Sequence, residues 1–569
     1  MIALVRNIGR VAVLALLVLV ALSVLAPVAP IVPIVNVSRV FAAATPAQDQ
    51  KPDDPVARES LKLAEVYRAL EQNYVGKGDP DAVILNGGIR SMLSVLDPFS
   101  AFFDRDQFES LQQQARGEAL GFGSILYVQT GKVLVLQTAQ GSPSWRAGLG
   151  PGDEIVAVDG TRIAGLDFNS LVQLLQQSRS KPARLGVIHP GKDVSEDVQL
   201  RPAEVALPTV DKVFLLDHGV GYIHVSGFES KTPQEIIDAV QKLRSQAGKG
   251  DTSNRGKRAR GEEQGLAGLI LDLRDNHGGL VEAALGVASV FLKPDELVLN
   301  IRGRSGAGRA PAKSYKTVPA PFHYNGPLVA LVNGETASAA EVVTAALEEH
   351  DRALVAGEPT YGKGVVETVE PLSEKMGLAL ITAQYFTPSG RSIQRPLPGT
   401  QLAAAVAQGS PDGPADSAAG SKGAAAFHTD DGRPLQSGGG ITPDVLVPPR
   451  PLDPWATFLD QRGAFTQFAS EYISTHASVT SSFEADAAVM REFRDFLGRL
   501  QVRVPEEYWT PDQGYLKMRI KAELFNLVYG LSRGDEVEVR ADPQVQKAAT
   551  LFSELPALLK PARTKSARR

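Results

Sequence analysis

The chain has 569 residues, of which 43% are hydrophobic and 22% charged, and its formal net charge is −5. That length exceeds what one hydrophobic core can use and predicts roughly three or four folded units. The slightly acidic balance gives no reason to expect a nucleic-acid partner. Because there is no cysteine, disulfide bonds, thiol catalysis and cysteine–zinc sites are excluded. Eight scattered histidines without ligand spacing predict no metal, and no motif calls for another cofactor.

Residues 1–45 are predicted to be an export segment and not part of the fold. Two arginines precede an apolar run from Val11 to Leu25, and residues 42–44 (AAA) offer a small-residue cleavage site. Cleavage there would give a periplasmic or secreted protein. If the segment is not cleaved, residues 11–35 would anchor the protein in the inner membrane with its bulk outside the cytoplasm.

Two small units are predicted next along the chain. Residues 55–115 keep apolar positions at helical spacing and contain the turn LDPFS, which predicts an N-terminal helical unit. Residues 116–200 hold short apolar runs separated by turn signals, with helix-sized segments at 144–149 and 168–177. This pattern predicts a compact, β-rich module.

Residues 205–450 alternate short apolar runs with helical stretches at 233–246, 281–292 and 339–349. Such alternation predicts strands buried between helices in a layered α/β core. With the units before and after it, this core makes the chain a multidomain α+β protein.

Two segments of the core are predicted to be flexible insertions, at 246–265 and 401–432, because they are charged or rich in small residues. A basic cluster at 255–260 lies in the first of them. It could bind a lipid or a polyanion, but a solvated loop explains it more simply. Residues 451–569 carry aromatic residues at helical spacing and predict a C-terminal helical domain.

The stretch VNGETASAAEVV (332–343) predicts a strand, a tight turn and a helix that begins near Ser338. Ser338 could simply cap that helix, with Glu341 at the capping-box spacing. Alternatively it could be a nucleophile, because the N–H groups of a helix N-terminus would stabilise an oxyanion formed there. The next histidine, His350, lies at the far end of the helix, so a nucleophile would need another base.

Two glycine-containing motifs bear on that choice. Lys363 lies between two glycines in YGKG, and flanking glycines let a backbone pass close to another element. A free lysine titrates at about 10.4, so it acts as a base at neutral pH only where burial lowers its pKa. The glycine pair of GLILDLRDNHGG could point its amides at an anion. Taken singly, YGKG is better explained as an ordinary turn, and a lone pair of glycines is weak evidence of a site.

Taken together, the motifs resemble the carboxyl-terminal processing (tail-specific) serine peptidases. The resemblance covers about residues 55 to 448 and rests on GLILDLRDNHGG, VNGETASAAEVVTAAL, GEPTYGKG, YFTPSGRSIQ and GGGITPDV, with LDPFS in the helical unit. It implies that Ser338 is the nucleophile, that Lys363 is the general base, and that the oxyanion amides belong to Gly279 and Ala339. A lysine then takes the proton, and no histidine is needed.

The chain departs from the family pattern at two positions. Glu367 stands where the family usually has the glutamine that orients the lysine, and His277 stands in a turn that is usually rich in asparagine with proline or glycine. An ionised carboxylate next to the lysine would favour its ammonium form. Glu367 is therefore expected to be protonated, to point away from the lysine, or to give the enzyme an alkaline pH preference.

The module at 116–200 resembles the peptide-binding PDZ domain of the same family. The segment GSPSWRAGLGPGDEIVAVDG (141–160) carries most of this resemblance. It implies that a substrate's C-terminal carboxylate is bound by a loop whose residues are Leu120, Gly121, Phe122 and Gly123, with the peptide added as a strand. A purely structural β-module is the alternative.

The sequence thus predicts an exported serine endopeptidase of Ser-Lys type. It would cleave extracytoplasmic proteins near their C-termini through an acyl-enzyme, with unstructured C-terminal tails as substrates. An adaptor protein or a homo-oligomer is left open. Two rival hypotheses are a scaffold that binds tails without cutting, with Glu367 as the lesion, and an esterase that uses the same acyl chemistry.

Overall fold

The computed structural model describes residues 55–76, 79, 81–250, 265–303, 313–403, 427–451, 454–476, 478–509 and 513–559. The predicted export segment, the basic cluster at 255–260 and most of both predicted insertions lie outside these residues. Helix α7 runs on to Gly250 and a strand occupies Phe427–His428, so the predicted start of the first insertion and the predicted end of the second fall on regular structure. Within the described ranges, no helix has the length and apolar character needed to cross a bilayer.

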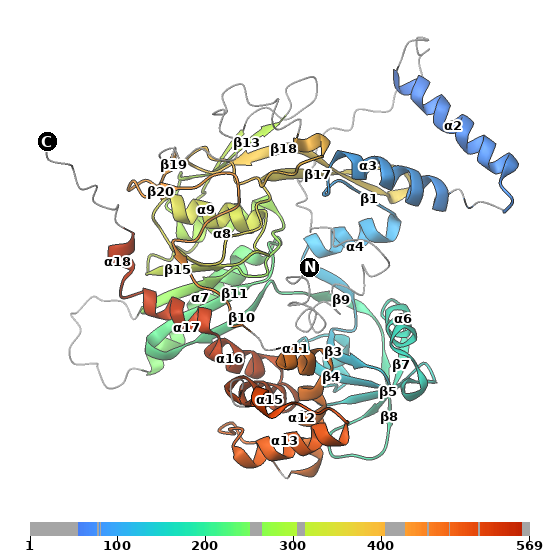
Figure 1. Ribbon diagram of the computed structural model, residues 1–569, viewed down its shortest axis with the longest axis vertical. Helices are drawn as coiled ribbons and strands as arrows, with labels where there is room; N and C mark the ends of the chain where they lie inside the picture. Colours follow the sequence, from blue (N-terminus) through green and yellow to red (C-terminus); the bar gives the residue numbers. More distant parts are fainter. Residues whose placement is uncertain are drawn as a thin grey trace.

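A six-stranded sheet forms the centre of the core (Figure 1). Its first two strands are antiparallel and the others parallel. The strands GLILD and LVALV are buried at every residue, as expected for parallel strands covered on both faces. In order across the sheet, the strands are β10 (Val210–Leu215), β11 (Val220–Val225), β12 (Gly268–Asp272), β15 (Leu328–Val332), β16 (Leu354–Gly357) and β21 (Val445–Leu446).

Different parts of the chain cover the two faces of this sheet. Helices α7 (Thr232–Gly250), α8 (Val281–Phe291) and α9 (Ala339–Glu349) pack on one face. The other face is covered by α16 (Leu531–Ala541) and α17 (Pro543–Leu551), which come from the C-terminal region. The C-terminal region therefore completes the hydrophobic core of the sheet.

A second, five-stranded sheet joins the N-terminal unit to the core. Strand β1 (Ala101–Phe103) pairs antiparallel with β18 (Gly377–Phe386), so the segment around LDPFS is held against the core. The other strands are β13 (Leu297–Gly303), β14 (Lys313–Lys316) and β17 (Val365–Pro371), and the unit's helices are α2 (Pro55–Asn73), a π-helix (Asp81–Ile89), α3 (Arg90–Leu96) and α4 (Arg105–Ala115).

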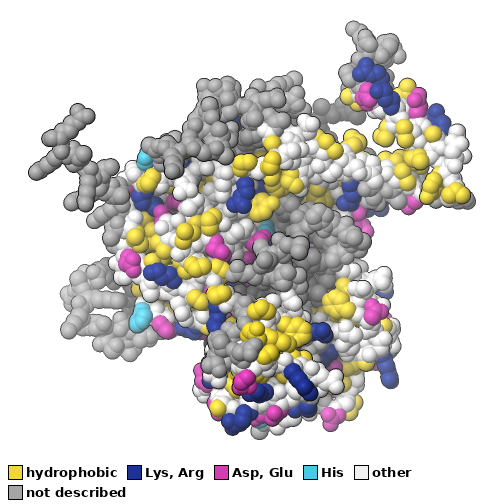
Figure 2. Space-filling model, viewed as in Figure 1, with side chains coloured by type: hydrophobic (Ala, Val, Ile, Leu, Met, Phe, Trp, Pro, Cys, Tyr) yellow, Lys and Arg dark blue, Asp and Glu magenta, His cyan; other side chains and the backbone are white. Residues whose placement is uncertain are grey.

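Helix α2 projects from the body of the molecule (Figure 1) and leaves apolar side chains exposed along its length (Figure 2). Leu61 is 62% exposed, Leu63 52% and Val66 59%.

The β-rich module has a hydrophobic core of its own. Its sheet has β3 as an edge strand, followed in order by β4, β5, β7 and β8. Before it, β2 (Glu118–Gly121) pairs with β9 (Ala203–Ala206) in a two-stranded ribbon that leads to the layered α/β core. The module's elements are β3 (Ser124–Gln129), β4 (Lys132–Thr138), α5 (Pro143–Arg146), β5 (Glu154–Val158), β6 (Thr161–Arg162), α6 (Phe168–Ser178), β7 (Ala183–Ile188) and β8 (Glu196–Leu200).

The remaining C-terminal helices pack against this module. Leu134 and Leu136 of β4 share a buried cluster with Phe465, Phe493 and other aromatic residues of the helices, which lie beside β3 and β4 in Figure 1. The helices are α11 (Pro454–Gln461), α12 (Ala464–Thr475), α13 (Ala487–Arg499), α14 (Glu506–Trp509) and α15 (Gln513–Tyr529), and a hairpin of β19 (Phe427–His428) with β20 (Pro434–Leu435) precedes them. Helix α18 (Leu555–Leu558) lies instead against the cluster on the central sheet, next to α17. The predicted multidomain mixture of helical, β-rich and layered α/β parts is confirmed.

Candidate active site

Ser338 occupies the sharp turn between β15 and α9. Its φ is +55° and its ψ −118°, a backbone conformation that a residue with a side chain rarely adopts. Strain of this kind persists only where surrounding contacts fix it, and it is concentrated at functional sites. The side chain is almost fully buried, with 3% of the residue exposed, and its neighbours Ala337 and Ala339 are small.

The buried carboxylate of Glu341 links the turn of Ser338 to the loop of Lys363, between β16 and β17. Its Oε2 accepts the N–H groups of Ser338 and Lys363, both at 2.9 Å. Its Oε1 accepts the Thr360 hydroxyl at 2.5 Å and the Gly362 N–H at 2.8 Å. Burial raises the pKa of Glu341, although these four donors lower it in part. The sequence indicated Glu341 only as a capping partner, so its contact with the lysine segment was missed.

The hydroxyl of Tyr385 lies between the backbone carbonyl groups of the same two residues. It is 3.1 Å from the Ser338 oxygen and also contacts the Lys363 oxygen. Two side chains therefore bridge Ser338 and Lys363: Glu341 binds their N–H groups, and Tyr385 contacts their carbonyl groups. No sequence signal pointed to Tyr385, which lies on β18.

Lys363 is fully buried, and its Nζ donates a 2.6 Å hydrogen bond to Glu367 Oε2. Glu367 does not point away from the lysine, so that alternative was wrong. Burial raises the pKa of Glu367, the ammonium of Lys363 opposes this, and the charge of Asp97 adds to it. Glu367 Oε1 has no hydrogen-bond partner among the described residues. Within the same part of the chain, Nζ makes no hydrogen bond to the Ser338 hydroxyl.

The turn LDPFS of the N-terminal unit reaches this pair. The ring of Phe99 lies 4.8 Å from Lys363 Nζ. Asp97 holds the turn, because one of its oxygens accepts the N–H groups of Phe99 at 2.8 Å and Ser100 at 2.6 Å. The N-terminal unit thus helps to close the site over the lysine.

The glycine pair lies against the turn of Ser338. A Cβ on Gly278 would come within 2.9 Å of the Ala339 nitrogen, and one on Gly279 within 2.2 Å of the Phe228 oxygen. Asn276 fixes the pair, since its side chain accepts the Gly278 N–H and its carbonyl accepts the Ala337 N–H, both at 2.9 Å. The N–H groups of Gly279 and Ala339 have no acceptor in the described part of the chain.

His277, the second departure from the family pattern, has a partly exposed side chain 4.0 Å from Glu335. Among the described residues, its side chain forms no hydrogen bond or ion pair with Ser338, Lys363 or Glu367.

The loop at 120–123 leaves amides free in the β-rich module. Leu120 and Gly121 belong to β2, whereas Phe122 and Gly123 follow it and their N–H groups find no acceptor among the described residues. A Cβ on Gly123 would lie 2.3 Å from that of Ser142, so this position requires glycine. Strand β3 follows directly and is an edge strand, which can accept an added strand.

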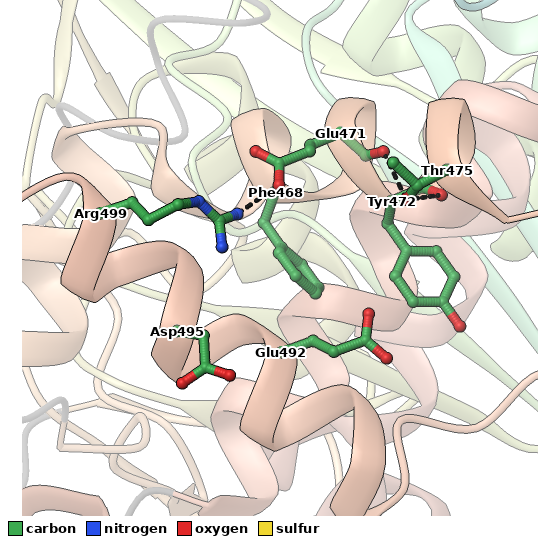
Figure 3. Close-up of a pocket in the computed structure, with 7 residues that line it drawn as sticks. All are labelled: Phe468, Glu471, Tyr472, Thr475, Glu492, Asp495 and Arg499. Carbon is green, nitrogen blue, oxygen red and sulfur yellow. Dashed lines mark hydrogen bonds and ion pairs between the residues drawn. The ribbon is translucent and has the colours of Figure 1, made fainter.

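A surface pocket elsewhere lies between α12 and α13, far along the chain from Ser338 (Figure 3). Arg499 and Glu471 form an ion pair at its edge, and Thr475 bonds the helix backbone. Its charged lining offers no nucleophile–base pair. The lining residues are Phe468, Glu471, Tyr472, Thr475, Glu492, Asp495 and Arg499. In the described ranges no cluster of three or more His, Asp or Glu side chains could hold a metal ion.

Comparison with known proteins gives the family. The chain is 31% identical over 392 residues to the chloroplastic C-terminal processing peptidase of Tetradesmus obliquus. The aligned part makes up 62% of this chain and 78% of that protein. The chain belongs to the carboxyl-terminal processing serine peptidases. Residues 219–401 match the family model of Peptidase family S41, and residues 134–188 that of the PDZ domain. The family predicted from the motifs is thereby confirmed.

Two further proteins are similar to this chain. Carboxy-terminal processing protease CtpA of Bacillus subtilis (strain 168) is 28% identical over 335 residues, which are 59% of this chain and 66% of that protein, just under two thirds. The solved structure of a photosystem II D1 C-terminal processing protease is 29% identical, covering 59% of this chain and 90% of that one, with a TM-score of 0.30.

Proposed function

We propose that this carboxyl-terminal processing peptidase is an exported endopeptidase of Ser-Lys type that cleaves extracytoplasmic proteins near their C-termini. The observation that carries the proposal is the convergence at one turn. The strained Ser338, the buried Lys363 and the unpaired N–H groups of Gly279 and Ala339 all lie around the start of α9. Export is inferred from the sequence of residues 1–45 alone.

In the proposed reaction, Ser338 Oγ attacks the carbonyl carbon of the scissile peptide while its proton passes to Lys363 Nζ. The developing oxyanion accepts hydrogen bonds from the N–H groups of Gly279 and Ala339. Lys363 then gives the proton to the leaving amine, which leaves an acyl-enzyme, and water hydrolyses this ester by the same steps in reverse. Lys363 must turn from Glu367 toward Ser338 for the first step. Catalytic hydrogen bonds often tighten only when substrate is bound.

The PDZ domain supplies the proposed preference for chain ends. The unpaired amides of Phe122 and Gly123 support capture of a C-terminal carboxylate, and the free edge of β3 supports addition of the tail as a strand. Substrates are then proteins with unstructured C-terminal tails.

The test compares the full-length protein with Ser338→Ala and Lys363→Ala on an unfolded protein substrate. Each substitution should lower kcat/KM by on the order of 10³-fold or more with little change in melting temperature. Ser245→Ala and Lys242→Ala, at exposed positions of α7, are the matched controls and should be fully active. Wild-type activity in Ser338→Ala would exclude the proposed nucleophile, and an inactive wild type would favour the tail-binding scaffold.

A further inference from the structure

Glu341 makes more contacts than a helix cap needs. A capping box requires one reciprocal bond within the first helical turn, and Glu341 forms it with the Ser338 N–H. The same carboxylate also accepts three donors from residues 360–363, which lie at least 19 positions further along the chain. The additional bonds therefore join two separate segments, and both carry a residue of the proposed dyad.

The four donors fill the four acceptor positions of one carboxylate. Each oxygen of Glu341 receives two hydrogen bonds, and an ionised carboxylate is the side chain that accepts on both oxygens and donates on neither. Glu341 is fully buried. An interior carboxylate with all its donors supplied holds its surroundings in one geometry.

The network extends to a motif that the proposed reaction leaves without a role. In GGGITPDV, the Ile441 N–H donates to the Thr360 hydroxyl at 2.7 Å, and that hydroxyl donates to Glu341. A Cβ on Gly440 would lie 2.6 Å from the Thr360 oxygen, so glycine permits this close approach. The motif therefore supports the position of Thr360, and through it that of Glu341.

We propose that Glu341 is a positioning residue, which sets the distance between Ser338 and Lys363 by holding both of their N–H groups on one carboxylate oxygen. Tyr385 assists it by contacting the carbonyl groups of the same two residues. This inference rests on the proposed Ser-Lys reaction. Neither Glu341 nor Tyr385 touches the substrate in this role, and each acts through the backbone of the dyad.

Glu341→Gln is the informative change. Glutamine keeps the shape and one acceptor oxygen, but its NH₂ group cannot accept. It would face either the N–H groups of Ser338 and Lys363 or the donors of Thr360 and Gly362, and that pair would lose its acceptor. A displacement of about 1 Å between reacting groups can cost about 10²-fold in rate. We expect kcat in the full-length protein to fall by about 10²-fold while KM changes by less than about 3-fold. Tyr385→Phe should lower kcat by about 10-fold, and the double variant should be clearly non-additive, because both side chains act on one geometry.

Glu348→Gln is the matched control. Glu348 lies two turns further along α9, is equally buried and pairs with Arg391. Its replacement should lower the melting temperature and leave kcat of the folded enzyme unchanged. If Glu341→Gln behaves in the same way, Glu341 has only a structural role and the proposal is overturned. Should that variant not fold, unchanged kcat in Tyr385→Phe would overturn it instead. Activity in Ser338→Ala would show separately that the proposed reaction itself is wrong.

Discussion

Replacing Glu367 by glutamine should increase activity at neutral pH. Lys363 Nζ and Glu367 Oε2 are 2.6 Å apart and both side chains are fully buried. At an effective dielectric of about 20, their gross attraction is about 6 kcal/mol. Most of this is offset, because burying two charges that have few other partners is costly. The remaining attraction stabilises the ammonium form of the lysine relative to the free amine.

The proposed general base must be free of that proton to act, so Glu367→Gln should move the acidic limb of the kcat/KM profile to lower pH. The assay is hydrolysis of an unfolded protein substrate from about pH 5 to pH 10. Glu370→Gln, an exposed position on the same strand, should leave the profile unchanged. Burial raises the pKa of Glu367, and an unmoved limb would mean that this carboxyl is already protonated. A limb at higher pH would refute the reasoning altogether.

Three further predictions concern other parts of the molecule. Burial, and then the charge of Glu235, raise the pKa of Glu229 to about 8, so the folded state favours the neutral acid. The stability that this bound proton contributes to the folded state is therefore lost as pH rises from about 4.5 to 8. Glu229→Gln should accordingly raise the melting temperature at pH 8 more than at pH 5, and an equal effect at both would contradict this. Amidation of a substrate's C-terminus should raise KM because the amides of Phe122 and Gly123 lose an anion, and equal cleavage of free and amidated tails would rule that role out. A chain that ends at residue 450 should aggregate, since one face of the central sheet loses its cover; a soluble, monomeric product would contradict this.

The sequence was informative where chemistry is local. The helices at 233–246, 281–292 and 339–349 correspond to α7, α8 and α9, because their apolar periodicity is strong and glycine or proline lies near their ends. Ser338 and Lys363 were singled out by small flanking residues, and the close approach expected at the glycines around Lys363 is present.

What the sequence could not supply is contact between distant segments. Nothing in the spacing of Glu341 and Gly362 indicates that a carboxylate on a helix will meet amides of a distant loop, and Tyr385 on β18 carries no motif. Likewise, the aromatic periodicity after residue 451 predicts helices but not the surface they cover. The residues Val545 and Leu551 pack on the sheet of the core, whereas Phe465 packs on the PDZ strands. The predicted role of the free amides at Phe122 and Gly123 stays a prediction.

The position of α17 has a consequence for how the enzyme matures. Arg274, at the end of β12, binds both Asp542 and Gln544 at the start of α17, at 2.8 and 2.7 Å. During synthesis, the segments that carry Ser338 and Lys363 emerge well before residues 543–551, and until then the apolar face made by Ile270, Val329 and Leu331 lacks the cover of α17. The peptidase core can therefore reach its native packing only when nearly the whole chain has been synthesised. A nascent chain that stops short would be left without a finished active site, so proteolytic activity would depend on completion of the chain.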